Sequence, residues 1–532
     1  MRAGTIKFIL LIDCAIGVLA ALLISAGFSS NHIQTASAED CEALISDKRL
    51  GGDDEFSGTL CINGIEAPYD EKTQTYYVPQ SLKTEGYDGK LTWESLHERA
   101  YLIADAEFSN KESAIASGER FQLVTVSGGA YSEQSVVFTG LPMCVLDTDA
   151  ESQARFGDDE KSGGWMRIYE PEGGTDGGYR ISTHNIAYKP RGNSSANNPK
   201  QQYSVWFFTS NKEATAVETL GLRKADTIFF NSMYGDESKV RDKLSYDIWE
   251  SLAGASPGRG NPAASRYTYA EMLEEGEYAG LFGVMDRCAE EEATQWGEST
   301  VIYKLSTRLM EYCKNPDRFE PDNPKLDECH SVKILYPKRT EPSDWDYIID
   351  YANTVFLQGV NADPEDVLSR ACLENLIDYS LYVQAIAGLD NIELNMIWYA
   401  KPQKDGYVMH RAPWDLDCTF GKEHNLTWRT DMGFAKMQFE QMEIQALQKS
   451  RPEWINPMLA ERWEALRKGP FSEKEIFGML AAERRKITAS GALARDTARW
   501  PECGNTADVS DIEAFIRLRL EYLDAYYAGL IQ

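Results

Sequence analysis

The chain has 532 residues, of which 43% are hydrophobic and 11% aromatic, so it can bury packed cores and is not a disordered polypeptide. Its formal net charge of −29 argues against nucleic-acid binding, which needs a basic surface. Its six histidines and the absence of any C-x-x-C pair argue against a zinc site.

The first 38 residues predict export. Arg2 and Lys7 precede an apolar run, Phe8–Phe28, and Ala36-Ser37-Ala38 is typical of a signal-peptide cleavage site, with cutting after Ala38. The run spans about 21 residues, so an uncleaved signal anchor is the alternative. Both alternatives predict an extracellular or cell-surface protein whose only membrane contact is this segment.

Residues 39–150 predict a small β-rich region. Strand-like runs separated by turn residues lie at 75–82, 121–128 and 135–148. Export would permit disulfides. Two cysteine pairs are close enough in sequence to be candidates, Cys41 with Cys61 and, further along the chain, Cys313 with Cys329.

Residues 151–340 predict a sheet-rich lobe. Three strands are followed by a helix and by a hairpin with a Glu-Gly turn, at 165–171, 179–195, 202–210, 239–254 and 267–287. Residues 341–532 predict a helical lobe, with helices over 344–359 and 371–389 among others. This order predicts an α+β fold of two lobes, with a ligand bound between them.

Two carboxylates lie in an apolar phrase, APWDLDCTFG, at residues 412–421. Asp415 and Asp417 are costly to bury there unless something pairs with them. Divalent metal ions take such oxygen ligands, and a metal ion bound to phosphate would be a partner for both carboxylates. The structural alternative is a loop that Asp415 and Asp417 hold by hydrogen bonds.

A predicted hairpin brings further oxygen ligands to the same place. Asp390 and Asn395 precede two strand-like runs, 396–400 and 407–414, and the second run leads to Asp415. Because the two open ends of a hairpin lie close together, we expect Asp390, Asn395 and Asp415 to converge. Protein kinases arrange a catalytic Asp, an Asn five residues on and a metal-binding Asp for phosphoryl transfer in a similar order. In the structural alternative, Asp390 only caps a turn.

Five segments, in order, resemble the spore-coat protein H (CotH) kinase family of atypical secreted kinases. They are KPRGNSSANNPKQQYSVWF, VRDKLSYDIW, EYAGLFGVMDR, IYKLS and PWDLDCTFG, at residues 189–207, 240–249, 277–287, 302–306 and 413–421. The resemblance covers roughly residues 160–425. One departure is Asp286, where the family is expected to have Glu, which puts a lysine–carboxylate pair there in doubt.

The resemblance implies a two-lobed protein-kinase-like fold, an antiparallel sheet lobe followed by a helical lobe, that binds ATP with Mg²⁺ or Mn²⁺. It implies that Asp390 is catalytic and that the metal ligands are Asn395, Asp415 and Asp417. It places the nucleotide phosphates near Asn193, Ser194, Ser195, Lys200, Arg241 and Lys304. The implied activity is transfer of the ATP γ-phosphate to a hydroxyl group, with a protein Ser or Thr as the expected acceptor.

Three other functions stay open. Asp415-Leu416-Asp417 is also the D-x-D pattern of metal-dependent glycosyltransferases, although no alternating strand–helix nucleotide domain precedes it. A degenerate kinase-like fold would suit a spore-coat or cell-envelope protein that binds carbohydrate through some of the 27 Tyr and 12 Trp residues. A glycosidase would use two carboxylates, but Asp415 and Asp417 are too close along the chain to flank a sugar bond by themselves.

Overall fold

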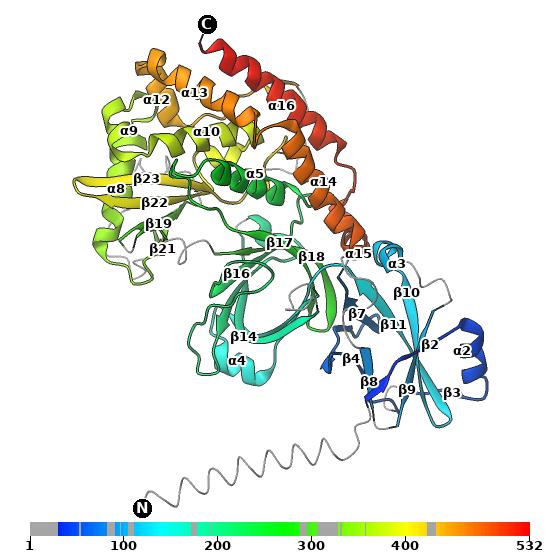
Figure 1. Ribbon diagram of the computed structural model, residues 1–532. Coiled ribbons are helices and arrows are strands. Elements are labelled where there is room, and N and C mark those ends of the chain that lie inside the picture. Colours follow the sequence, from blue (N-terminus) through cyan, green and yellow to red (C-terminus); the bar gives the residue numbers. More distant parts are fainter. Residues whose placement is uncertain are drawn as a thin grey trace, which may run out of the picture.

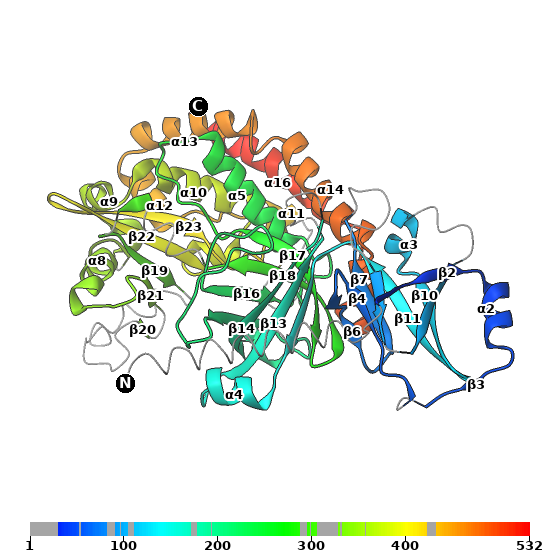
Figure 2. The same ribbon diagram turned by 60° about the horizontal axis from the view of Figure 1, so that its bottom comes forward.

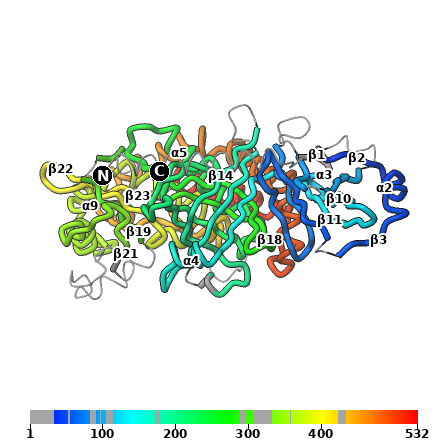
Figure 3. The backbone as a smooth tube through the Cα atoms, turned by 90° about the horizontal axis from the view of Figure 1, so that it is seen from below, coloured from blue at the N-terminus to red at the C-terminus, as the bar shows by residue number. Residues whose placement is uncertain are grey.

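The computed structural model describes residues 30–531 apart from 53–54, 82–90, 96, 105–110, 172–177, 193, 288–294, 298, 306–327, 330–331, 357 and 423–431. Figures 1 and 3 show three bodies in a row: an N-terminal β region, a barrel, and a sheet covered by helices. The predicted α+β class is confirmed, whereas the two-lobed kinase-like arrangement stays a prediction. No helix in these ranges is long and apolar enough to cross a bilayer, and the predicted signal segment 8–28 lies outside them.

The N-terminal region contains sheets with the strand orders β1–β8–β4–β5 and β2–β9–β10–β11–β7–β6, and β3 pairs with β11. Its elements are β1 (Ser30–His32), β2 (Gln34–Ala36), α2 (Ala38–Ile45), β3 (Arg49–Leu50), β4 (Thr59–Ile62), β5 (Ile65–Glu66), β6 (Tyr69–Asp70), β7 (Thr75–Pro79), β8 (Leu91–Glu94), β9 (Arg99–Ile103), α3 (Lys111–Ser117), β10 (Arg120–Ser127) and β11 (Ala130–Thr139). Strands β1 and β2 precede the predicted cleavage site, so cleavage after Ala38 would remove one edge strand from each sheet.

The predicted disulfide between Cys41 and Cys61 is wrong, because both cysteines are free and buried. Cys41 lies on α2 near Glu133 of the second sheet, whereas Cys61 lies on β4 near Glu94 of the first sheet. Closeness in sequence therefore did not bring the two sulfurs together. The other candidate pair is not tested, because Cys313 lies outside the described residues.

A closed barrel follows, with the strand order β12–β13–β14–β15–β16–β18–β17. Its strands, with α4 (Ala150–Phe156) beside them, are β12 (Met143–Asp147), β13 (Ser162–Glu170), β14 (Arg180–Pro190), β15 (Tyr203–Phe208), β16 (Thr227–Asn231), β17 (Tyr267–Glu274) and β18 (Glu277–Asp286). The antiparallel neighbours β13, β14 and β15 and the Glu275-Gly276 turn were predicted. The closure was not predicted, because it depends on parallel pairing of β12 with the distant β17.

The last body is a sheet with the order β20–β21–β19–β22–β23, and Figure 2 shows helices α10 and α13 on its upper side. Its strands are β19 (Val301–Leu305), β20 (Glu328–Cys329), β21 (Val332–Tyr336), β22 (Met396–Gln403) and β23 (Gly406–Pro413). The helices include α5 (Arg241–Ala255), α8 (Asp346–Tyr351), α9 (Pro364–Arg370), α10 (Leu373–Ile386), α11 (Met432–Ala435), α12 (Met442–Ser450), α13 (Pro452–Arg467), α14 (Glu473–Ala489), α15 (Ala492–Arg499) and α16 (Ser510–Gly529). One hydrophobic core joins this sheet to α5, α10 and α16.

Helix α5 links the barrel to the helices. Leu244, Ile248, Trp249 and Leu252 recur at helical spacing and are all buried, which explains why this segment forms a helix against the core. Its first turn, which contains Asp242, lies next to the exit of the β22–β23 hairpin, since Asp242 contacts the chain just after β23.

Candidate active site

The β22–β23 hairpin brings Asn395 and Asp415 to one end of the sheet. Its register pairs Met396 with Pro413, and the next residues continue the pairing, because the Trp414 N–H donates to the Asn395 carbonyl at 3.1 Å. Asn395 and Asp415 both have a left-handed backbone, with φ of 54° and 57°. Asparagine and aspartate adopt this conformation more readily than other non-glycine residues, so these two residue types suit the two ends of the hairpin.

The turn that contains Asp390 is tied to the same end of the hairpin. Asp390 lies in the short helix η7 (Leu389–Ile392) and is 5% exposed. Its neighbour Asn391 is fully buried, and the Asn391 Nδ2 donates to the carbonyls of Asn395 and Trp414, at 2.9 Å each. Asn391 therefore fixes the position of the Asp390 turn relative to the hairpin.

Asp242 is a third carboxylate beside Asp415 and Asp417. It is 6% exposed, and its two oxygens accept hydrogen bonds from the Leu416 N–H at 2.9 Å and from the Asn231 amide at 2.8 Å. Burial, and then the charges of Asp417 and Asp415, raise the pKa of Asp242 well above its ordinary value. The side chain of Asp417 is exposed to solvent. Partial desolvation by the surrounding protein, and then the charge of Asp415, raise the pKa of Asp417 to about 6. These carboxylates repel one another, and a bound cation would relieve the repulsion.

Arg191 and Lys304 lie against the ring of Trp414, next to Asp415. The Lys304 Nζ is 4.5 Å and the Arg191 Cζ 5.9 Å from the ring centroid, and Arg191 also lies 4.6 Å over Phe229. Burial, and then the charge of Arg191, lower the pKa of Lys304 to about 8, while Asp415 opposes the shift. Burial also lowers the pKa of Arg191, again opposed by Asp415. Neither cation forms an ion pair with a described residue, so both can bind an anion.

Arg241 and Lys422 belong to a buried ionic cluster behind the site. Arg241 forms an ion pair with Asp236, and the Arg241 N–H donates to the other oxygen of that carboxylate at 2.9 Å. Lys422 is 4% exposed; burial lowers its pKa, and the charges of Asp236 and Asp417 oppose the shift. The charge of Arg241 is therefore compensated inside the protein.

Lys200 and Asp286 both lie in buried pairs apart from these carboxylates. Lys200 is 1% exposed, and its Nζ donates to Asp496 of α15 at 2.6 Å and to the Leu281 carbonyl at 2.5 Å. Burial lowers the pKa of Lys200 to about 8, and the charge of Asp496 opposes the shift. The carboxylate of Asp286 accepts hydrogen bonds from the Arg223 guanidinium at 2.9 and 3.0 Å. The partner of Asp286 is thus an arginine, whereas the resemblance raised the question of a lysine.

The structure describes the loop at 192–195 in part. Asn193 lies outside the described residues, and Ser194 begins the short helix η2 (Ser194–Asn197). The Ser195 hydroxyl accepts a hydrogen bond from the side chain of Gln202. Since Arg191 belongs to the site, the loop begins beside it.

A family model described as CotH kinase protein matches residues 188–523. The chain belongs to this CotH kinase family. The match begins in β14 and ends within α16, so every residue of the site described above lies inside it. It confirms the resemblance that the five sequence segments indicated. A comparison with curated proteins found no match.

The site of this CotH-family protein fits a hydrated divalent ion. In the described part of the chain, no group of three or more His, Cys, Asp or Glu side chains is placed to hold a metal by itself. Mg²⁺ in nucleotide sites keeps several waters and takes one or two carboxylates together with phosphate oxygens. The exposed carboxylates of Asp415 and Asp417 can fill this role, and Asn395, which is half-buried, can add an amide oxygen.

Sequence reasoning missed Asp242, Arg191 and Lys422. Arg191 directly precedes the G-N-S-S segment and Asp242 directly follows Arg241, so both stand beside predicted residues of the CotH-family pattern. Adjacency alone does not identify a role. The hydrogen bond that links Asp242 to the D-L-D loop joins residues 174 positions apart.

Proposed function

We propose that this protein is an exported or surface-anchored kinase that transfers the γ-phosphate of ATP to the hydroxyl of a protein Ser or Thr, with Mg²⁺ or Mn²⁺. The observation that carries the proposal is that groups of opposite charge gather around Trp414. Asp415 and Asp417 would be the metal ligands, and Arg191 and Lys304 would be the phosphate ligands. A metal–triphosphate complex needs both kinds of group.

The cations support an anionic ligand on energetic grounds. Arg191 and Lys304 are half-buried, and the charge of Arg191 acts unfavourably on that of Lys304. Two such cations without ion-pair partners are costly to keep together unless an anion compensates them. Phosphate oxygens would do so, and would stabilise the charged form of Lys304 near neutral pH.

The carboxylates would act in distinct ways. Asp415 and Asp417, with Asn395, would hold the metal, which when bound neutralises phosphate charge. Asp390 would orient the acceptor hydroxyl and accept its proton, because Asn391 fixes its turn beside the metal ligands and its charge contributes to the raised pKa of Asp417. Asp242 is a positioning residue, since it accepts from the backbone of the D-L-D loop.

Calorimetric titration of the full chain with ATP, with and without Mg²⁺ or Mn²⁺, tests the proposal. Asp415→Asn removes a metal ligand, and Asp405→Asn, in the exposed turn at the far end of the same hairpin, is the matched control. We expect metal-dependent binding by the wild type and the control. In Asp415→Asn the affinity should fall about 10- to 100-fold, as expected for loss of a contact to a charged group. Wild-type affinity in Asp415→Asn would refute the metal assignment.

Two further measurements separate the alternatives. Asp390→Asn should keep ATP binding and lose transfer of radiolabelled phosphate to a Ser/Thr peptide library; undiminished transfer would remove Asp390 from its role. Metal-dependent binding of a nucleotide sugar in place of ATP would indicate a glycosyltransferase. Binding of neither ligand would indicate a degenerate envelope or carbohydrate-binding protein on the same fold.

A further inference from the structure

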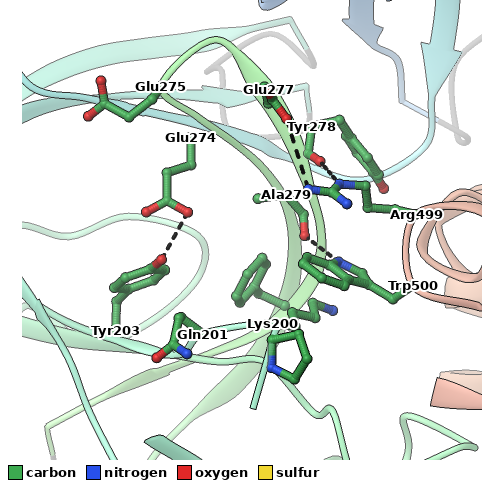
Figure 4. A pocket seen from close by; sticks show the side chains of 12 residues that line it. Lys200, Gln201, Tyr203, Glu274, Glu275, Glu277, Tyr278, Ala279, Arg499 and Trp500 are labelled. Carbon is green, nitrogen blue, oxygen red and sulfur yellow. Dashed lines mark hydrogen bonds and ion pairs between the residues drawn. The ribbon is translucent and has the colours of Figure 1, made fainter. Parts of the chain in front are cut away.

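A cavity of about 340 Å³ opens on the barrel at the turn between β17 and β18 (Figure 4). Its walls come from the start of β15, from the strands that flank this turn, and from the end of α15. None of the residues around Asp415 lines it. Lys200, for which the resemblance implied a phosphate role, does line it, but this ammonium is paired with Asp496. The cavity therefore lies apart from the carboxylates around Asp415, and a ligand bound in it would not depend on the proposed kinase function.

Aromatic rings form much of the wall. Trp500 is fixed by a hydrogen bond from its Nε1–H to the Ala279 carbonyl, at 2.9 Å, and the guanidinium of Arg499 lies 4.3 Å over its ring. Tyr203 and Phe282 line the cavity as well. The Lys200 ammonium likewise lies 4.8 Å over the Phe282 ring. Because protein cations already lie over the Trp500 and Phe282 rings, the aromatic wall favours the alkyl part of a ligand, and the charged end needs a carboxylate.

The carboxylates of the cavity differ in how far they are compensated. Glu277 lies 3.1 Å from the Lys72 ammonium and 4.0 Å from the Arg499 guanidinium. Glu275 accepts hydrogen bonds from the N–H and the hydroxyl of Thr148, at 2.8 and 2.6 Å, but forms no ion pair with a described residue. It remains an uncompensated charge at the rim.

Glu274 is the central carboxylate. Figure 4 shows its side chain pointing across the cavity toward Tyr203, whose hydroxyl donates to Glu274 Oε2 at 2.9 Å. Glu274 is half-buried, no described cation pairs with it, and burial raises its pKa above the ordinary value. Lys200 also lines the cavity, but its charge is compensated by Asp496.

We propose that this cavity binds an alkylammonium ion, the charged amine either of a free polyamine or of a lysine side chain. Glu274 is placed to accept the ammonium hydrogens, which would compensate a carboxylate that is partly removed from water. The methylene chain would pack against Phe282 and Trp500. The volume is in the range of small-molecule sites, and the aromatic wall distinguishes the cavity from a metal site.

Calorimetric titration of the full chain tests this site. The probes are spermidine and an acetylated, amidated Gly-Lys-Gly peptide, at a salt concentration of about 0.15 M, which screens non-specific attraction to the acidic surface. We expect saturable binding at one site. Glu274→Gln should weaken it at least about tenfold, since a hydrogen bond to a charged group is lost. Glu213→Gln makes the same charge change at an exposed position outside the cavity and should leave the affinity unchanged.

Glutamine can still accept from the Tyr203 hydroxyl, so Glu274→Gln should fold, and its thermal unfolding should match that of the wild type. Glu275→Gln is a second variant, expected to weaken binding by a smaller factor. Tighter binding of spermidine indicates a free amine as the ligand, and tighter binding of the peptide indicates a side chain. No saturable binding of either probe, or equal affinities in Glu274→Gln and Glu213→Gln, would overturn the proposal.

Discussion

Glu440 is a buried carboxylate whose ionisation should destabilise the helical part of the protein. It lies just before α12, is 7% exposed, and is close to Tyr526 and Tyr527 of α16. Its Oε1 and the Tyr527 hydroxyl are both buried without a hydrogen-bond partner among the described residues. Burial raises the pKa of Glu440 from 4.5 to about 7.

The sign and size of the effect depend on this pKa. The folded protein binds the Glu440 proton more tightly than the unfolded chain does. The contribution of protonated Glu440 to the free energy of unfolding is therefore fully present below about pH 4.5 and is lost as the pH rises through about 7. A difference of roughly 2.5 in pKa, at ~1.4 kcal/mol per unit, amounts to about 3 kcal/mol between pH 4 and pH 8. Glutamine has the same shape and stays neutral, so Glu440→Gln should abolish this loss.

Hydrogen–deuterium exchange of the α12 and α16 amides measures local stability in a chain of several bodies. At pH 8, the opening free energy of these amides should be higher in Glu440→Gln than in the wild type by up to about 3 kcal/mol. The difference should shrink as the pH falls toward 4.5. Glu461→Gln, at an exposed position on α13, is the matched control and should show no such trend. A difference between Glu440→Gln and the wild type that does not change with pH would refute the reasoning.

Three variants test the assignments around the candidate site. Arg191→Gln should weaken metal-dependent ATP binding about 10- to 100-fold, the loss expected for one charged hydrogen bond, whereas Arg167→Gln, which removes an arginine 5.2 Å over another tryptophan ring, should leave it unchanged. Lys200→Met should lower the free energy of unfolding by about 3 kcal/mol in a denaturant titration, because it leaves the buried Asp496 carboxylate with the more distant ammonium of Lys239, at 3.8 Å. A fully stable variant that has lost ATP binding would instead favour a phosphate role for Lys200. Asp415→Gly should raise the stability by up to about 1 kcal/mol, because its left-handed backbone suits glycine, and should lose metal-dependent ATP binding in the same titration.

The local part of this architecture could be predicted from sequence. Runs at 396–400 and 407–414 anticipated β22 and β23, because two short apolar runs joined by a polar turn specify a hairpin without help from the rest of the chain. The hairpin register then places Asn395 and Asp415 at one end. The Glu275-Gly276 turn between β17 and β18 was predictable for the same reason.

Features that depend on distant partners could not be predicted. The resemblance implied a phosphate role for Lys200, which stays a prediction. No local pattern could show that its ammonium pairs with Asp496, because the two residues lie 296 positions apart. The contacts of Arg191 and Lys304 with Trp414 likewise join distant segments, because Arg191 follows β14, Lys304 lies in β19 and Trp414 follows β23. In each case the sequence contains the charge, while the fold determines whether the charge is compensated or available to a ligand.

The surroundings of the Asp415 carboxylate distinguish the functional from the structural alternative for the D-L-D loop. A loop-holding role requires its carboxylate to accept hydrogen bonds, yet no described residue donates one to it and the side chain is exposed. The loop is held instead by Asp242, which accepts from the Leu416 N–H, and by the Tyr246 hydroxyl, which accepts from the Asp415 N–H at 3.3 Å. Aspartate tolerates a left-handed backbone better than most residues but less well than glycine, so the backbone conformation alone gives no reason for a carboxylate at this position. A stabilised Asp415→Gly protein without metal-dependent ATP binding would show that the carboxylate serves a ligand, whereas a destabilised one with intact binding would return Asp415 to the structural alternative.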